Sequence, residues 1–286
     1  MILYHYCSND EFYSIITNRA IWLSSLSLSS DSMEGKLVAK LIAGMAKADN
    51  LDEIAVQRLA SSVSLLEEVM EGLGFCLSEE GDLLSQWRGY AEDATGVSIG
   101  FSKDYLDKLS EASKNPELPG FTLQKIVYDY NAQQDLLKPT YKKIKELIDE
   151  GAFRMPRMQS LLGAESQEEI DAENEKIKNK FSDLNLTILT LFTSLFRLKT
   201  KAFQEEREWR LISFLVKVTN DQCLFRASLD KIIPYRKYSL LDLGDNPIVQ
   251  VILGPKNKTP ETYVDSFLKQ NKFRNVGVIR SQASYR

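Results

Sequence analysis

The hydrophobic and polar positions of the chain follow two periodicities, one typical of strands and one typical of helices. Short runs rich in β-branched and aromatic residues predict strands in the first half at 2–6, 21–24, 74–78, 96–101 and 123–130. Similar runs predict strands in the last third at 208–216, 223–227, 248–253 and 276–279. Longer stretches with apolar residues at helical spacing predict helices at 9–18, 32–72 with a break near 49–50, 82–91 and 260–271.

The region between these two groups of strands has a helical pattern. It is polar after Lys138-Pro139, becomes rich in charge over 165–180 and continues as a more apolar helix over 186–203. Strands at both ends with helices between them favour an α+β fold, a mixed β core with helical insertions. We therefore expect a single α+β domain over residues 1–286, with a helical insertion at about 131–203. A separate helical subdomain at these residues is the alternative.

Composition narrows the class of protein. The chain has 286 residues, of which 43% are apolar and 27% charged, so it can bury a sizeable core and is not disordered. Its 36 basic and 40 acidic residues give a net charge of −4, which predicts no strong nonspecific binding to nucleic acid. The longest apolar run, 186–196, is shorter than the roughly 20 residues that span a bilayer. With no targeting signal visible, we expect a soluble cytoplasmic protein without membrane contact.

The cysteine and histidine counts exclude several kinds of site. Cys7, Cys76 and Cys223 lie far apart and no CxxC occurs, which excludes a disulfide framework and a zinc ribbon and suits a reducing cytosol. His5 is the single histidine, so multi-histidine metal sites cannot form within one subunit. We expect no metal site. A catalytic histidine, if there is one, must be His5.

Two stretches combine histidine or aromatic residues in a way that suits ligand contact. On a strand, His5 points away from both Tyr4 and Tyr6, and a lone histidine there is more often a hydrogen-bonded structural residue than a catalyst. On a helix, Trp87 and Tyr90 share a face. Such a pair usually packs in the core, and it becomes a binding surface when a planar ligand lies beside it.

A third stretch, 205–210, is dense in charge. If the segment is extended, the period of two places Glu206, Glu208 and Arg210 on one face. A solvated salt-bridge network is the ordinary interpretation. However, the apolar run 211–216 follows directly, and a charged cluster that leads into a buried strand suits an active site. Paired carboxylates there can stabilise a developing positive charge.

Several motifs along the chain carry a family resemblance. They are Leu3-Tyr4-His5-Tyr6-Cys7-Ser8, Ile21-Trp22-Leu23-Ser24, Phe75-Cys76-Leu77-Ser78, Leu84 to Ala91, Gly96-Val97, Glu206-Arg207-Glu208-Trp209-Arg210, 251–256 and Tyr285-Arg286. Taken in order, they resemble a large, mostly bacterial family known as domain of unknown function 2971. The segment 30–34 departs from the family pattern, because Ser30 and Ser32 stand where asparagine and proline are usual.

A looser resemblance is to the ADP-ribosyltransferase plan, with an early histidine strand, central aromatic residues and a late strand preceded by a glutamate. It implies an ADP-ribosyltransferase-like mixed β core with NAD as substrate and no metal. The resemblance implies that His5 binds a ribose of NAD and that Tyr6, Trp87 or Tyr90 stack on the nicotinamide. It also implies a catalytic Glu208, a supporting Glu206 and Arg210 as a phosphate or carboxylate clamp.

The function expected from this resemblance is cleavage of the nicotinamide–ribose bond of NAD and transfer of ADP-ribose to an unknown macromolecular or small-molecule acceptor, as a toxin or phage-defence effector. The alternative is a noncatalytic domain of the same fold that senses a ligand or binds a partner protein. A nuclease is less compatible with the sequence, because no metal site of usual spacing occurs and the net charge is acidic.

Overall fold

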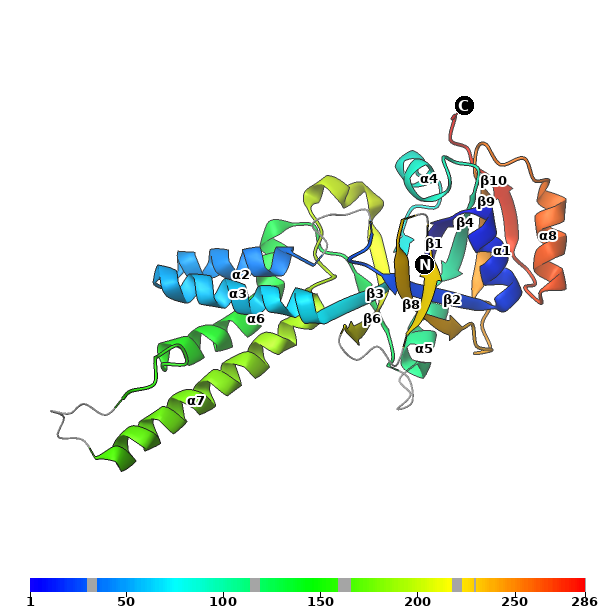
Figure 1. The fold of residues 1–286 in the computed structure, drawn as a ribbon. Coiled ribbons are helices and arrows are strands. Elements are labelled where there is room, and N and C mark those ends of the chain that lie inside the picture. The colour runs from blue at the N-terminus through cyan, green and yellow to red at the C-terminus, as the bar shows by residue number, and fades with distance from the viewer. Residues whose placement is uncertain (30–34, 114–118, 159–165, 218–222, 229, 286) are drawn as a thin grey trace. The chain divides into compact units, whose positions relative to one another are not determined.

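The computed structural model describes residues 1–29, 35–113, 119–158, 166–217, 223–228 and 230–285 (Figure 1). The segment 30–34, which departs from the family pattern, and Arg286 lie outside the described residues. The chain forms two compact units. The first consists of residues 1–30, 71–126 and 200–286, and the second of residues 31–70 and 127–199.

The first unit contains a 10-stranded sheet, counted over the described residues. Its main path runs β10-β9-β4-β1-β3-β2-β8-β7, and β6 joins it through β3 and carries β5. The strands are β1 Ile2–Cys7, β2 Ala20–Ser25, β3 Met70–Ser78, β4 Val97–Ser102, β5 Thr122–Lys125, β6 Glu208–Val216, β7 Leu224–Ala227, β8 Ile232–Ser239, β9 Ile248–Leu253 and β10 Gly277–Arg280. Because β9 and β10 pair in parallel while pairs such as β1 and β4 are antiparallel, the sheet is mixed. This confirms a mixed α+β architecture.

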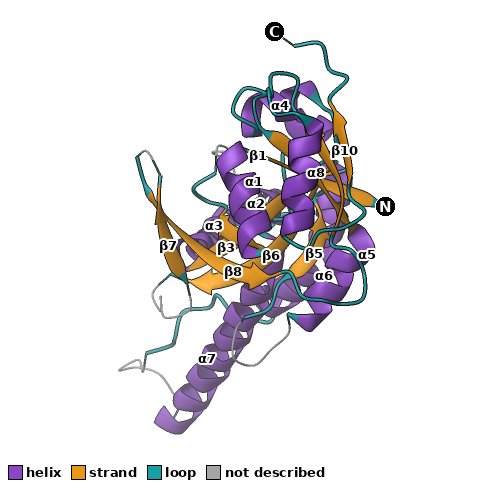
Figure 2. Cartoon of the chain, turned by 90° about the vertical axis from the view of Figure 1, so that its right-hand side faces the viewer, coloured by secondary structure: helices purple, strands orange, loops and turns teal. Residues whose placement is uncertain are grey.

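Helices α1 (Asn9–Asn18), α5 (Lys103–Ala112) and α8 (Glu261–Gln270) pack their apolar sides against the sheet. Figure 2 shows α1 and α8 side by side over the strands, where Phe12 and Phe267 meet with ring centroids 5.8 Å apart. Strand alternation supplies the opposing surface. Leu3 and Cys7 of β1 pair with Phe101 and Val97 of β4, and all of these side chains are buried in the main core.

The other side of β1 carries a smaller cluster. Tyr6 packs with Trp87 of α4 (Leu84–Tyr90), with Ala91 and Ala94 and with Ile252 of β9. The loop after α4 bends sharply, because three consecutive residues (92–94) have φ values of 47°, 51° and 72°. This left-handed turn brings the chain back to begin β4, and its strain is tolerated because the surrounding packing holds it.

The second unit is helical. It contains α2 (Leu37–Ala48), α3 (Glu53–Val69), α6 (Tyr130–Asp149) and α7 (Gln167–Leu189), which lie alongside one another (Figure 1). Tyr141 of α6 donates a hydrogen bond of 3.0 Å to the carboxylate of Asp49, just after α2. The sequence predicts a helical insertion at about 131–203. In the structure, the helical unit consists of residues 127–199 together with the earlier stretch 31–70.

The structure ends one predicted helix early and contains two elements that the sequence pattern did not predict. The helix predicted over 186–203 ends at Leu189 and gives way to the 3-10 turns η1 (Thr190–Ser194) and η2 (Lys201–Glu206). Strand β8 was not predicted, because Pro234 cannot donate a ladder hydrogen bond and argues against a strand. Helix α5 was also not predicted, although the Ser102 hydroxyl accepts the Tyr105 amide as an N-cap.

The close approach of backbone at Gly96 gives a test of this packing. A methyl group added at Gly96 would lie 2.1 Å from the Cys7 carbonyl oxygen, whereas one added at Gly89 meets nothing within 4 Å. We expect Gly96→Ala to lower the free energy of unfolding by at least about 1–3 kcal/mol, because the backbone of β1 must shift. Gly89→Ala, in a helix, should be neutral or stabilising by about 0.5–1 kcal/mol. Urea unfolding of both variants measures the difference, and equal stability would contradict the packing.

Candidate functional site

Strand β3 is the element that gathers the candidate site residues. It pairs with β1, β2 and β6, with Tyr4 opposite Ser78 and Ser24 opposite Gly74. Its side chains alternate: Phe75 and Leu77 are buried in the main core, while Cys76 between them is exposed. We call the side of the sheet that carries Cys76 the β3 face. Because Cys76 is exposed in mid-strand, this face is open to solvent there.

The start of β6 lies against the end of β3. The Ser78 hydroxyl donates to the Glu206 carbonyl oxygen at 2.7 Å, and the Glu79 amide donates to the Arg207 carbonyl oxygen at 3.2 Å. Within β6, Leu211 belongs to the same core as Phe75 and Trp209 packs against that core. By alternation, Glu208 and Arg210 point to the opposite side, which is the β3 face.

Glu208 and Arg210 form a buried ion pair. Arg210 donates from Nε to Glu208 Oε1 at 2.6 Å and from a terminal nitrogen to Oε2 at 3.0 Å. The two side chains are only 7% and 3% exposed. A two-pronged guanidinium–carboxylate contact is directional, so it holds the Glu208 carboxylate in one orientation.

Glu206 lies outside the strand, at the end of η2, and Arg207 after it has a left-handed φ of 43°. The segment from Glu206 to Arg210 is therefore not extended throughout. The Tyr90 hydroxyl donates to Glu206 Oε1 at 3.2 Å. Glu206 is buried, whereas Tyr90 is 43% exposed, so an accessible aromatic ring stands beside a shielded carboxylate.

Tyr6 and Trp87 hold the loop that follows β3. The Tyr6 hydroxyl donates to the Glu80 carbonyl oxygen and accepts the Leu83 amide, both at 2.8 Å. Its burial, the largest influence, raises the pKa of Tyr6, so the hydroxyl stays protonated and able to donate. Trp87 meets Tyr6 edge-on, with ring centroids 4.9 Å apart. Tyr6 is 5% and Trp87 0% exposed, so neither ring offers a free face for stacking in this structure.

His5 lies on the other side of β1 and reaches β3 from there. Its Nδ1 lies 2.8 Å from the Cys76 carbonyl oxygen, so Nδ1 carries a proton and donates. Its Nε2 lies 3.4 Å from Glu11 Oε1, and its ring stacks on Phe75 with centroids 3.9 Å apart. None of these contacts involves Glu206 or Glu208. Cys76 and Ser78 are nevertheless two positions apart on β3, about 7 Å along the strand. His5 and the start of β6 are therefore attached to neighbouring points of one strand.

The electrostatics around His5 involve residues that the sequence did not single out. Burial alone would raise the pKa of the Glu11 carboxyl, but the hydrogen bond with His5 and the charges of His5 and Arg226 lower it. Arg226 of β7 also donates to the Ser24 hydroxyl at 3.4 Å. Nothing in the local pattern around Arg226 marks it, because its position depends on pairing between segments far apart in the sequence.

Asp82 ties the loop after β3 to residues close to the end of the chain. It accepts hydrogen bonds from Trp87 Nε1 at 2.7 Å, from the Gln282 amide at 2.7 Å and from the Ser281 hydroxyl. Burial opposes ionisation of Asp82, but these hydrogen bonds outweigh it and lower the pKa of the carboxyl below its usual value. A sequence search for reactive clusters misses Asp82, since its partners lie at distant positions.

Among the residues that the structure describes, no group of three or more His, Cys, Asp or Glu side chains is arranged to hold a metal ion. In the same residues, no helix has the length and apolar character needed to cross a bilayer. The three cysteines form no disulfide.

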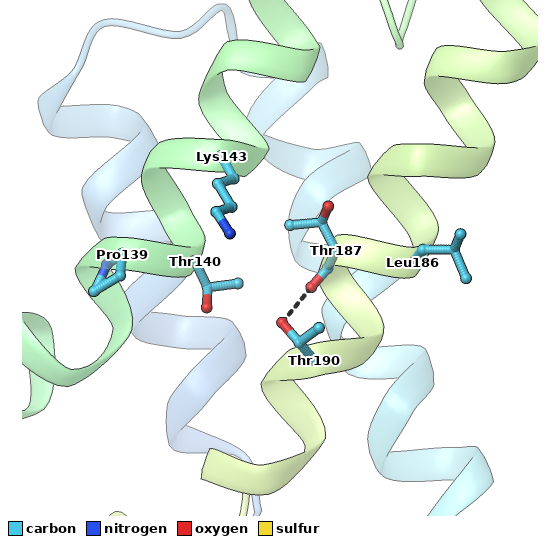
Figure 3. Close-up of a pocket in the computed structure, with 6 residues that line it drawn as sticks. All are labelled: Pro139, Thr140, Lys143, Leu186, Thr187 and Thr190. Carbon is cyan, nitrogen blue, oxygen red and sulfur yellow. Dashed lines mark hydrogen bonds between the residues drawn. The ribbon is translucent and has the colours of Figure 1, made fainter.

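Two pockets lie elsewhere. In the first unit, a pocket of about 290 Å³ between α1 and α8 is lined mostly by aromatic and aliphatic side chains, among them Tyr13 and Tyr263. In the second unit, Figure 3 shows a pocket of about 200 Å³ formed by Lys143 and Thr140 of α6 and by Thr187 and Thr190, where the Thr190 hydroxyl donates to the Thr187 carbonyl oxygen. Neither contains a residue that the sequence predicted for the site.

The comparison with family models agrees with the motif resemblance but assigns no activity. Residues 86–211 match the model of the family described as "Protein of unknown function (DUF2971)". The matched stretch includes Trp87, Tyr90, Glu206, Glu208 and Arg210, and the match supports the resemblance to that family. No curated protein and no solved structure matches the chain.

The three hydrogen bonds of Asp82 predict a pH-dependent contribution to stability. Because its folded-state pKa is lowered, the contribution is complete above the usual carboxyl value of 3.8 and is lost as the pH falls through the lower folded-state value. We expect Asp82→Asn to lower the free energy of unfolding by about 1–3 kcal/mol at pH 7. The difference in the free energy of unfolding between Asp82→Asn and the wild type should narrow as the pH falls below the usual carboxyl pKa.

Chemical unfolding at several pH values measures this gap. Asp135→Asn, at an exposed position of α6, is the matched control and should change little. A gap that stays constant down to pH about 2 would contradict the role of the Asp82 charge.

Proposed function

We propose that the chain is an ADP-ribosyltransferase-like enzyme that cleaves the nicotinamide–ribose bond of NAD and transfers ADP-ribose to an acceptor. The observation that supports it best is the attachment of His5 and of the glutamate-bearing start of β6 to β3 at Cys76 and Ser78. At Cys76 the β3 face is open, and it is the face toward which Glu208 points, whereas His5 stacks on Phe75 on the core side of the same strand. One strand thus combines the histidine and carboxylates that the resemblance requires.

The chemistry suits these side chains. Departure of nicotinamide leaves positive charge on the ribose, as in glycoside cleavage. A carboxylate fixed in advance lowers the barrier, because no reorganisation is needed when the charge develops. Glu208 meets this condition through its two hydrogen bonds from Arg210. In the proposal Glu208 faces the sugar, and Arg210 positions it.

The other residues take roles that follow from their exposure. Tyr90 offers the accessible ring for the nicotinamide, and Glu206 beside it orients the attacking group of the acceptor. The Nε2 edge of His5, with Glu11 next to it, is the edge that a ribose hydroxyl would meet. Tyr6 and Trp87 support this arrangement by holding the loop after β3.

Glu208→Gln tests the catalytic role. The substitution keeps the shape and an oxygen that accepts from Arg210, but removes the charge that faces the sugar. We expect release of nicotinamide from NAD to fall by at least about 100-fold, the scale of losing one preorganised electrostatic contact. Chromatographic detection of nicotinamide measures it, and circular dichroism checks the fold.

Glu205→Gln is the matched control, because Glu205 is exposed and one residue away from Glu206. It should release nicotinamide like the wild type. Equal turnover in Glu208→Gln and the wild type would show that the catalytic assignment is wrong.

A noncatalytic domain that senses a ligand is the second candidate, and one observation favours it. Both oxygens of Glu208 accept hydrogen bonds from Arg210, and the pair is buried, so the charge is largely neutralised in this structure. Titration calorimetry with NAD separates the two candidates. Binding without release of nicotinamide, with bacterial extract supplied as a source of acceptors, supports the sensor; release supports the enzyme.

The proposed enzyme includes a biological role as a toxin or phage-defence effector in the cytoplasm, where NAD is available. Expression of the wild type in bacterial cells should then slow growth, and expression of Glu208→Gln should not. Equal growth of the two cultures, at matched protein levels, would contradict the role as a toxin. It would not contradict cleavage of NAD by the purified protein.

A further inference from the structure

Arg226 is a half-buried arginine with one unsatisfied nitrogen in its side chain. Its Nε is buried and has no hydrogen-bond partner among the described residues. Among the described residues, the side chain makes one hydrogen bond, a long one of 3.4 Å from a terminal nitrogen to the Ser24 hydroxyl. Leaving a buried cationic donor unpaired is costly, so such a group in a folded protein is expected to meet water, an ion or a ligand.

The surroundings of Arg226 place it on the β3 face. Ser24 pairs with Gly74 of β3, and Leu23 beside it is buried in the main core, so Ser24 points to the β3 face. Arg226 lies close enough to Glu11 for its charge to act on that carboxyl, and Glu11 contacts His5. The charge of Arg226 therefore acts on the carboxylate that lies next to the His5 edge assigned to a ribose.

An aromatic pair continues this side of the sheet. Trp22 lies two residues before Ser24 on β2, and Tyr235 of β8 is directly opposite Ser24. Their rings are tilted against each other with centroids 4.7 Å apart, and both residues are half-buried. A planar base can pack on such rings, since aromatic surfaces stack favourably. A cationic fork next to half-exposed aromatic rings suits an adenine nucleotide.

We propose that Arg226 binds the phosphates of an adenine nucleotide, with Ser24 as a second donor and the Trp22–Tyr235 pair beside the base. This inference rests on the proposed function, in which the nucleotide is the ADP part of NAD. Guanidinium groups suit phosphate because their coplanar N–H donors match two oxygens at once. The buried Nε and a terminal nitrogen form such an edge, and phosphate would satisfy the donor that lacks a partner.

Glu11 gives the proposal a second consequence. Its carboxylate lies within reach of the Arg226 charge and opposes the approach of an anion. Removing this negative charge in Glu11→Gln should tighten the binding of inorganic pyrophosphate, whereas removing the positive charge in Arg226→Gln should weaken it. Opposite effects from two substitutions are not expected from general loss of structure.

Titration calorimetry of the full chain with ADP, inorganic pyrophosphate and adenosine tests the inference. We expect Arg226→Gln to weaken ADP and pyrophosphate at least tenfold and to leave adenosine unchanged. Arg226→Lys keeps the charge without the fork and should fall between. Arg274→Gln, at an exposed arginine, is the control and should match the wild type.

The outcomes separate this inference from the proposed function. Unchanged ADP affinity in Arg226→Gln, an equal loss for adenosine, or a wild type that binds neither ADP nor pyrophosphate would each overturn the role of Arg226. A wild type that binds ADP through Arg226 but releases no nicotinamide from NAD supports the inference and contradicts the transferase. If Arg226→Gln releases nicotinamide with an unchanged KM for NAD, the result supports the transferase and contradicts the role of Arg226.

Discussion

The first unit depends on the way β3 divides its backbone hydrogen bonds among three other strands. A strand has two edges, so three partners can be accommodated only if they pair with different parts of its length. In this chain β2 pairs at Gly74, while β1 pairs at Ser78 and the start of β6 lies against the same end. Two residues before Ser78, the Cys76 carbonyl oxygen accepts a hydrogen bond from His5. The position of the histidine is thus a consequence of strand pairing.

The buried charges near this junction carry a cost that the fold must offset. Removing two charges from water is expensive, and the attraction between Glu208 and Arg210 offsets that cost only because the contact is short and two-pronged. Breaking such a pair on one side costs several kcal/mol, whereas replacing both partners with apolar residues can be neutral. Stability alone therefore gives little reason to keep the pair.

Strand alternation predicted part of this site correctly from the sequence. His5 does point away from Tyr4 and Tyr6, because the period of two is a property of any strand. The helical spacing of Trp87 and Tyr90 was less informative. Positions three apart differ by about 60° around a helix, and this is enough to bury one ring fully and expose 43% of the other.

Contacts between distant segments could not be predicted in this way. The partners of Asp82 and Arg226 are set by how strands and loops assemble, and no local pattern contains that information. Strand β8 was missed for a different reason. Pro234 removes one donor, yet pairing with β2 and β7 on both sides still holds the strand in place. Tertiary pairing here overrides a local preference.

The exposed thiol of Cys76 allows the β3 face to be labelled with a thiol-reactive reagent. Burial raises the pKa of the Cys7 thiol, and it also raises the pKa of Cys223, so both favour the unreactive protonated form at neutral pH. Cys76 is the exposed cysteine of the three. A maleimide dye would therefore attach there first, without any engineered cysteine. The natural chain thus provides its own reporter position, from which the occupancy of this face can be followed by fluorescence in real time.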